Sequence, residues 1–93
     1  MPPIRSRDLH AALLRMGFVC EYRKDIWYFH VVDGGRTGIR TKMSHGEEEV
    51  GENLLHKMAR QLRLTRRELD CFVDGTLTQA EYITKLRTKG AIR

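Results

Sequence analysis

Apolar residues at helical spacing dominate the first part of the chain. They recur at intervals of three and four, at Leu9, Ala12, Leu13 and Met16. This spacing places them on one face of a helix. Ser6 stands before the pattern as a candidate N-cap, and Gly17 follows it as a candidate end.

After residue 17, the helical spacing of apolar residues gives way to patterns that are typical of strands. Residues 18–23 and 25–32 are rich in aromatic and β-branched side chains, which is typical of strands. Residues 36–43 alternate strictly, and one side of that strand would carry Thr37, Ile39, Thr41 and Met43. The other side would carry Gly38, Arg40 and Lys42. The pattern predicts a strand with one core-facing side and one side that presents two cations.

The loop between the second and third strands determines which side chains face outward. Its turn signal is Asp-Gly-Gly at residues 33–35. A two-residue loop at Gly34–Gly35 would place Phe29 opposite Arg40 and mix apolar and charged side chains on one face. We therefore predict a three-residue loop, because it pairs Phe29 with Ile39 and keeps the buried face apolar.

This loop predicts a polar outward face on the sheet. The core face of the second strand would carry Trp27, Phe29 and Val31. Ile26 would lie opposite Lys42 on the other face. The outward surface would then bring together Tyr28, His30, Arg40 and Lys42.

Helical spacing returns after three glutamates at residues 47–49, with an apolar stripe at Val50, Leu54, Leu55, Met58, Ala59 and Leu62. Two short helices should follow, since capping-box patterns stand at 65–68 and 78–81. The order of helix, three strands and three helices predicts an α+β fold with an antiparallel sheet. We expect residues 1–63 to form the core and residues 64–93 to form a helical extension packed on the same domain.

The charge of the chain favours an anionic partner. Its 93 residues carry a formal net charge of +5, and nucleic acid is the usual partner of a basic domain. The two cysteines, Cys20 and Cys71, form no CxxC motif, so we expect buried, reduced thiols and no metal. No apolar run approaches the roughly 18 residues that span a bilayer. Because residues 1–5 also lack a signal-peptide core, we expect a cytoplasmic protein that does not enter membranes.

Histidines are the candidates for proton transfer, which RNA cleavage by a 2′-hydroxyl requires. His45 is the first candidate, since its loop joins the basic strand to the start of a helix, where anions are favoured. His45 can equally shape the turn through hydrogen bonds. His30 is a second candidate, or simply an exposed strand residue. His10 and His56 lie on predicted helices beside the apolar stripes, and we expect them to pack at the surface or at the edge of the core.

Cations and one aromatic residue are the candidates for RNA contact. Arg40 and Lys42 can clamp phosphates, and Tyr28 can stack on a base or cover the sheet. Lys57 and Arg60 of the following helix can extend the cationic track or form an ordinary solvated face. No carboxylate–histidine spacing of the ligand type appears, and we expect neither a metal nor another cofactor.

The runs Leu13–Phe18, Ile39–Gly46 (Ile-Arg-Thr-Lys-Met-Ser-His-Gly) and Met58–Leu62 (Met-Ala-Arg-Gln-Leu) carry a family resemblance. They make the chain similar to the HicA toxins, in a longer subgroup with extra C-terminal helices. The resemblance covers Ser6 to Leu62 and implies a double-stranded-RNA-binding-domain-like fold of helix, three strands and helix. It also implies metal-independent cleavage of mRNA and a HicB-like antitoxin as partner. The functional histidine of that family lies early in the second strand, where this chain has Ile26.

Three interpretations stay open from the sequence. The chain is a HicA-like ribonuclease whose catalysis is impaired or relocated, or a non-catalytic RNA-binding module. The third interpretation is an interaction module whose basic face meets an acidic protein such as an antitoxin.

Overall fold

The structure is a computed structural model and describes residues 3–93. Its elements are β1 (Ile4–Arg5), α1 (Ser6–Arg15), β2 (Phe18–Tyr22), β3 (Ile26–Val32), β4 (Gly35–Met43), β5 (Glu49–Val50), α2 (Glu52–Gln61), α3 (Arg66–Asp74) and α4 (Gln79–Thr88). Strands β2, β3 and β4 form an antiparallel sheet in that order, and β1 pairs with β5 in a separate ribbon. The predicted α+β class with a three-stranded antiparallel sheet is confirmed.

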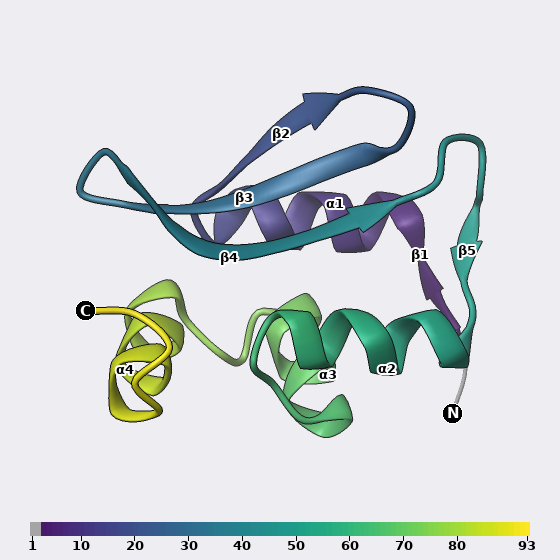
Figure 1. Cartoon of the computed structure of the whole chain (residues 1–93). Coiled ribbons are helices and arrows are strands. Elements are labelled where there is room, and N and C mark those ends of the chain that lie inside the picture. The colour runs from purple at the N-terminus through teal and green to yellow at the C-terminus, as the bar shows by residue number, and fades with distance from the viewer. Residues whose placement is uncertain (1–2) are drawn as a thin grey trace.

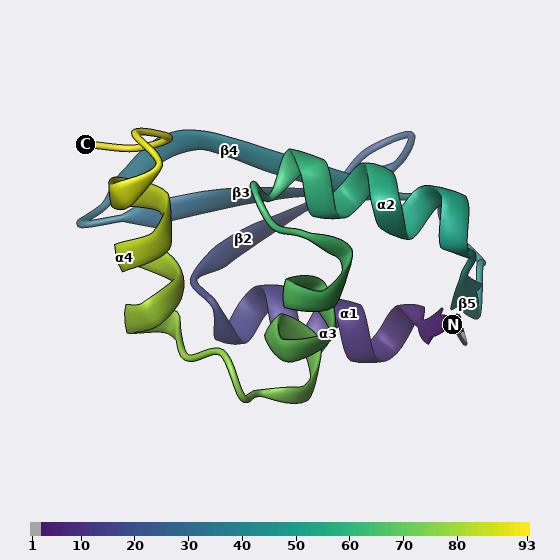
Figure 2. The ribbon, with the colours of Figure 1, turned by 90° about the horizontal axis from the view of Figure 1, so that it is seen from below.

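The helices all lie on one side of the three-stranded sheet (Figure 1). Helix α1 packs against β2 and α2 packs against β4, while α3 contacts both of these helices (Figure 2). No described element covers the opposite side of the sheet (Figure 1). The fold therefore has a helix-covered inner face and a free outer face.

Helix α1 begins differently from the prediction. Ser6 is its first residue rather than its cap, and no side chain caps the helix. Pairing of β1 with β5 brings Glu48 beside the helix start, where the Ser6 N–H donates to the Glu48 carbonyl at 2.9 Å. The β1–β5 ribbon therefore supplies an acceptor for the N–H of the first residue of α1, which has no partner within the helix. The Ser6 hydroxyl is buried and has no partner among the described residues.

The last two helices have the local signals that predicted them. Thr65 and Thr78 each accept a hydrogen bond from the backbone three residues on, and both reciprocal capping boxes are complete. Gly75 ends α3 in the left-handed conformation at φ 91°. The side chain of Arg15 donates to the Phe72 carbonyl at 2.9 Å, which ties α1 to α3.

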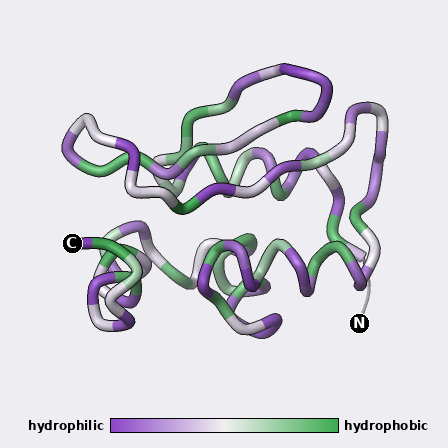
Figure 3. The backbone as a smooth tube through the Cα atoms, viewed as in Figure 1, coloured by the Kyte–Doolittle hydropathy of each residue, from purple (hydrophilic) through white to green (hydrophobic). Residues whose placement is uncertain are grey.

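One core joins the sheet to all four helices. Its fully covered large side chains include Tyr28, Leu9, Leu13, Leu55, Phe72 and Tyr82. Hydrophobic and hydrophilic segments alternate along the helices, as one buried face per helix requires (Figure 3). Cys20 and Cys71 are free thiols but only partly buried, so the prediction of full burial is wrong. Between Pro3 and Arg93, no helix combines the length and the apolar character needed to cross a membrane.

The predicted loop between β3 and β4 is also wrong. Val32 pairs with Gly35, so the turn has two central residues, Asp33 and Gly34. Both have positive φ, at 52° and 81°, which is typical of a tight type I′ hairpin turn. The pairing register then shifts between Val31 and Phe29. Gly38, at φ 93°, lies in the stretch of β4 that absorbs the extra residues.

This register reverses the faces of β3. Phe29 lies opposite Arg40 and Trp27 lies opposite Lys42, while Tyr28 lies opposite Thr41. Trp27 and Phe29 therefore lie on the outer face, and Tyr28 and His30 are buried beneath the helices. The prediction for β4 itself is confirmed, because Ile39, Thr41 and Met43 are buried and Arg40 is exposed.

Candidate functional site

The outer face of the sheet has an aromatic pair at its centre. Trp27 and Phe29 lie two residues apart on β3, and their rings stack with centroids 5.9 Å apart and planes 14° from parallel. Val19 and Glu21 of β2 flank them on one side, while Arg40 and Lys42 of β4 flank them on the other. We refer to Trp27, Phe29 and the surrounding charged side chains as the outer face.

Cationic side chains lie over this aromatic pair. The Arg36 guanidinium is 4.1 Å from the centre of the Phe29 ring, and the Arg23 guanidinium is 5.6 Å from it. Arg40 and Lys42 lie 5.8 and 5.3 Å from the centre of the Trp27 ring. Cations within about 6 Å of a ring face are attracted by its negative quadrupole. This attraction explains why aromatic and charged residues share one face without a helix above them.

Two carboxylates partly balance these cations. Glu21 pairs with both Arg36 and Arg23, and these hydrogen bonds lower the pKa of its carboxyl group. Asp25 pairs with Lys42 at 3.1 Å. Within residues 3–93, no carboxylate forms an ion pair with Arg40. The outer face thus keeps a net positive charge, and Arg40 is its unpaired cation.

Side chains cover the rings of the outer face, and no described backbone element does. Phe29 is only 8% exposed although no backbone element lies over it, since Arg36 and Arg23 cover its ring. An arginine side chain can turn toward a phosphate and leave the ring to a flat ligand, without any change in the fold. The arrangement is therefore suited to a ligand that alternates anionic groups with flat rings.

His45 lies in the exposed loop after β4. Its Nε2–H donates to the carbonyl of Arg23 at 2.8 Å, which leaves Nδ1 as the free ring nitrogen. Its ring lies 6.3 Å from that of Tyr22. This hydrogen bond joins the loop to the β2–β3 turn, as the turn-shaping interpretation of His45 expects. A catalytic role for His45 stays a prediction.

Tyr28 and His30 do not lie where the sequence placed them. Both are fully buried on the inner face, because the register shift turns β3 over relative to the prediction. The Tyr28 hydroxyl is 2.7 Å from Nδ1 of His10, and burial raises the pKa of Tyr28. Tyr28 therefore cannot stack on a base at the outer face.

His30 is enclosed by aromatic rings and one hydroxyl. Its Nδ1 lies 2.9 Å from Oγ1 of Thr37, while its ring lies 4.9 Å from Phe18 and 5.5 Å from Tyr82 of α4. Nε2 has no hydrogen-bond partner among the described residues. Burial lowers the pKa of His30, because the charged ring would be poorly solvated. This histidine cannot exchange protons with RNA on the outer face.

The helix cations separate into two groups. Lys57 and Arg60 are exposed residues of α2, and that helix lies on the helix-covered side of the sheet (Figure 1). Arg40 and Lys42 belong to the outer face. Arg66 has only 8% of its side chain exposed and pairs with Glu52 at 2.7 Å and Asp70 at 2.6 Å. It therefore holds α2 to α3 and is not available to a ligand. A role for Lys57 and Arg60 in RNA binding stays a prediction.

Sequence reasoning missed the aromatic residues of the outer face, Trp27 and Phe29, and the two arginines over Phe29, Arg23 and Arg36. The available signal was the alternation of aromatic positions in β3 with cationic positions in β4, which suits cross-strand cation–π pairs. The prediction instead placed Trp27 and Phe29 on the core face, because large aromatic residues are usually buried.

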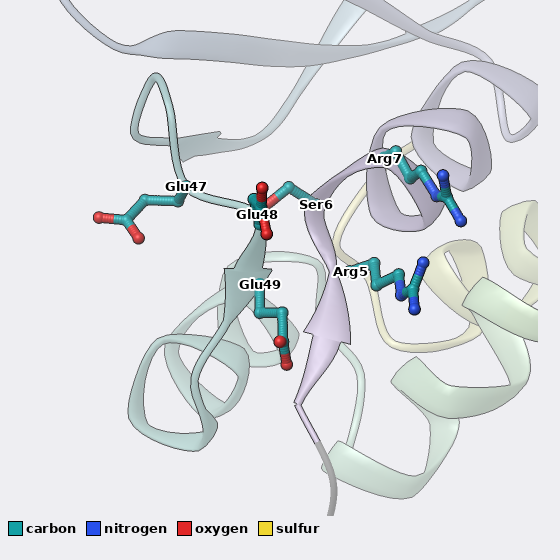
Figure 4. A pocket seen from close by; sticks show the side chains of 6 residues that line it. All are labelled: Arg5, Ser6, Arg7, Glu47, Glu48 and Glu49. Carbon is teal, nitrogen blue, oxygen red and sulfur yellow. The ribbon is translucent and has the colours of Figure 1, made fainter.

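A hollow beside the β1–β5 ribbon gathers charge without a reactive geometry. It is lined by Arg5, Ser6, Arg7, Glu47, Glu48 and Glu49. The side chains of Arg5 and Arg7 extend to one side, whereas Glu47 extends to the other (Figure 4). These charges do not converge on a shared point. In the part of the chain that the structure describes, no group of three metal-ligating side chains is found.

Comparison of the chain with protein-family models, with curated proteins and with solved structures gives no match.

Proposed function

We propose that this protein is a HicA-like RNA-binding protein that holds single-stranded RNA on its outer face. The observation that carries this proposal is the stacked pair Trp27–Phe29 beneath four cationic side chains, on a sheet face that no helix covers. Single-stranded nucleic acid offers flat bases for the rings and phosphates for the cations.

The arrangement favours RNA over an acidic protein. An acidic peptide would use the cations but would not need two stacked rings between them. Base stacking on an aromatic side chain contributes about 1–3 kcal/mol per base, and phosphate contacts add a salt-dependent term. Both parts of the outer face therefore contribute to binding RNA.

The HicA part of the proposal rests on the sequence motifs. Helix α1, strands β2 to β4 and helix α2 follow the order of a double-stranded-RNA-binding-domain-like fold, to which α3 and α4 are added. The proposed biological role is that of a toxin component acting on mRNA, with a HicB-like antitoxin as its partner.

Metal-independent cleavage of mRNA is the second part of this role and depends on His45. Its free Nδ1 lies in an exposed loop beside the β2–β3 turn, so the ring is accessible to a bound strand. Ile26, at the position of the family's histidine, supplies no acid or base. Binding without cleavage is therefore the alternative function, and it uses the same outer face.

Trp27 is the single tryptophan of the chain and reports directly on the outer face. We expect its fluorescence to be quenched by a mixed single-stranded RNA, with affinity that falls steeply as salt is added. Arg40→Gln should weaken binding, and Arg67→Gln at an exposed position of α3 is the matched control. A folded protein that shows no quenching and no binding at low salt would disprove the proposal.

Cleavage is measured in the same samples by following the length of the RNA. If His45 is catalytic, His45→Gln abolishes cleavage while the quenching of Trp27 persists. Intact RNA in the presence of the unaltered, RNA-bound protein would instead identify a binding module.

A further inference from the structure

A second concave region lies on the inner side of the sheet, between the first turns of α1 and the ends of β2, β3 and β4. It has a volume of about 210 Å³, and its walls include Tyr22, Ile26 and Tyr28. His10 and Ser6 of α1 line it as well. We refer to this region as the His10 hollow. None of the outer-face side chains takes part in it.

The chemistry of the hollow centres on a hydrogen-bonded pair. Nδ1 of His10 lies 2.7 Å from the hydroxyl of Tyr28, and the two rings meet edge to face with centroids 5.6 Å apart. Burial keeps Tyr28 neutral, because it raises the pKa of the phenol. A neutral phenol can donate to an unprotonated Nδ1 and can accept from a protonated one.

This pairing holds the His10 ring in one orientation in both protonation states. When the phenol donates to Nδ1 of the neutral ring, Nε2 carries the hydrogen, as it also does in the protonated ring. Nε2 has no hydrogen-bond partner among residues 3–93, and His10 is only partly buried. The pair therefore offers a fixed N–H donor to a ligand in the hollow, and a histidine that gains a proton adds charge to that bond.

The surroundings of His10 indicate what the ligand contains. Tyr22 has 68% of its surface exposed and supplies a ring at the edge of the hollow. The buried Ser6 hydroxyl has no hydrogen-bond partner within residues 3–93 and can donate to an anion. Arg7, with 76% of its side chain exposed, lies on the rim, and its guanidinium is 4.0 Å from the Asp8 carboxylate. Glu47 also lines the hollow but points away from Arg7 (Figure 4).

A chain of contacts connects the hollow to the outer face around the β2–β3 end of the sheet. The ring of Tyr22 lies 6.3 Å from His45, whose Nε2 bonds to the Arg23 carbonyl. The Arg23 guanidinium in turn lies over Phe29. One strand of nucleic acid can therefore follow these side chains from one face to the other.

We propose that the His10 hollow binds a single nucleotide of the RNA, with the phosphate at Nε2 of His10 and the base against Tyr22. This inference rests on the proposed function, since it assigns a second contact for the same strand. It adds a phosphate-binding histidine, His10, and a positioning residue, Tyr28.

The test uses adenosine 3′-monophosphate as the probe, with adenosine as the ligand that lacks the phosphate. Proton–nitrogen spectra of the four histidines report where the probe binds, and single variants assign the signals. We expect the nucleotide to shift the signals of His10 and to leave those of His56 unchanged. Adenosine should bind about tenfold more weakly, which is the size of one hydrogen bond to a charged group.

Two variants test the pair itself. His10→Gln should weaken nucleotide binding about tenfold, whereas the matched control His56→Gln should not change it. Tyr28→Phe removes one oxygen and keeps the ring, so we expect a smaller loss of about threefold together with a second nitrogen tautomer of His10 in the spectra. If His10→Gln unfolds the protein, the spectra of the unaltered protein and of Tyr28→Phe test the role of the pair.

The inference is overturned if the nucleotide leaves the His10 signals unshifted, or if His10→Gln binds it as tightly as the unaltered protein. Quenching of Trp27 by a long RNA separates this failure from that of the proposed function. If Trp27 is quenched while the His10 signals stay unshifted, the His10 hollow is not a nucleotide site and the outer face remains the proposed RNA site.

Discussion

The two faces of β3 bury aromatic side chains by different means. On the inner face, Tyr28 is covered by α1, and His30 is covered by the ring of Tyr82 from α4. On the outer face, Phe29 is covered to a similar extent by side chains that include Arg36, Arg23 and the stacked Trp27. A helix cannot leave its sheet without loss of the core, whereas an arginine can turn aside. Similar burial therefore has two origins. On the inner face it comes from packed helices, and on the outer face it comes from side chains that can move.

The largest expected difference between the faces is in stability. Tyr82→Ala empties a fully buried site among Phe18, His30 and Phe72, so it should lower the free energy of unfolding by about 3–5 kcal/mol. Phe29→Ala on the outer face should cost less than half of that, roughly 1–2 kcal/mol, since it leaves no enclosed cavity. Urea denaturation followed by circular dichroism measures both. Equal losses would mean that the arginine cover is as rigid as a helix.

The second difference is in the response of RNA binding to salt. The double variant Arg40→Gln, Lys42→Gln removes two outer-face cations, while Lys57→Gln, Arg60→Gln removes two from α2. The outer-face variant should reduce the slope of log affinity against log salt by about 1.4, at roughly 0.7 for each lost phosphate contact. Fluorescence titrations of Trp27 at several salt concentrations give these slopes. Equal reductions in the two variants would extend the RNA site to the helices.

The hairpin register that separates the two faces depends on Gly38. Its φ of 93° disfavours any side chain, and a Cβ there would meet no atom within 4 Å. Gly38→Ala should therefore cost about 1–2 kcal/mol through backbone strain alone. Gly35→Ala is the matched control, because Gly35 does not have positive φ and its Cβ would lie at an ordinary 3.8 Å from the Val32 carbonyl. Thermal unfolding of the two variants measures the difference.

His30 gives the inner face a dependence on pH. The folded protein holds the pKa of His30 below its ordinary value of 6.5, so it binds fewer protons than the unfolded chain. This contribution to stability is complete above pH 6.5 and is lost as the pH falls below it, by at most about 1.4 kcal/mol per pH unit. Tyr82, the titratable side chain whose ring packs on His30, stays neutral, because burial raises its pKa.

Urea denaturation between pH 7 and pH 5 measures the effect, with His30→Gln compared with the unaltered protein. The slope against pH should flatten in His30→Gln, while His45→Gln at the exposed loop should retain most of it. An unchanged slope in His30→Gln would show that protonation of this ring does not oppose folding.

Local signals were sufficient for the helices and the sheet class. The capping boxes at Thr65 and Thr78 depend on residues three positions apart, so the sequence alone predicts them. The alternation of Ile39, Thr41 and Met43 likewise identified the core side of β4. Each of these features is decided by neighbours along the chain.

The outer face required information that no local pattern holds. The register depends on Gly38 absorbing extra residues, and the faces of β3 follow from that shift. Ser6 is the first helical residue and not the cap, and its N–H bonds to the carbonyl of Glu48, which the β1–β5 ribbon brings beside it from a distant part of the sequence. Whether α4 would cover the inner or the outer face also depended on tertiary packing, which brings Tyr82 onto His30.

Closure of the core by the final helix has a consequence for how the protein is made. A ribosome releases the sheet, α1 and α2 well before Tyr82 and Leu86 emerge, and these two residues complete the core. Until then, Phe18, His30 and Phe72 lack their last neighbour, Tyr82. Translation that stops before α4 therefore yields a chain with an open apolar surface, which we expect chaperones and proteases to recognise.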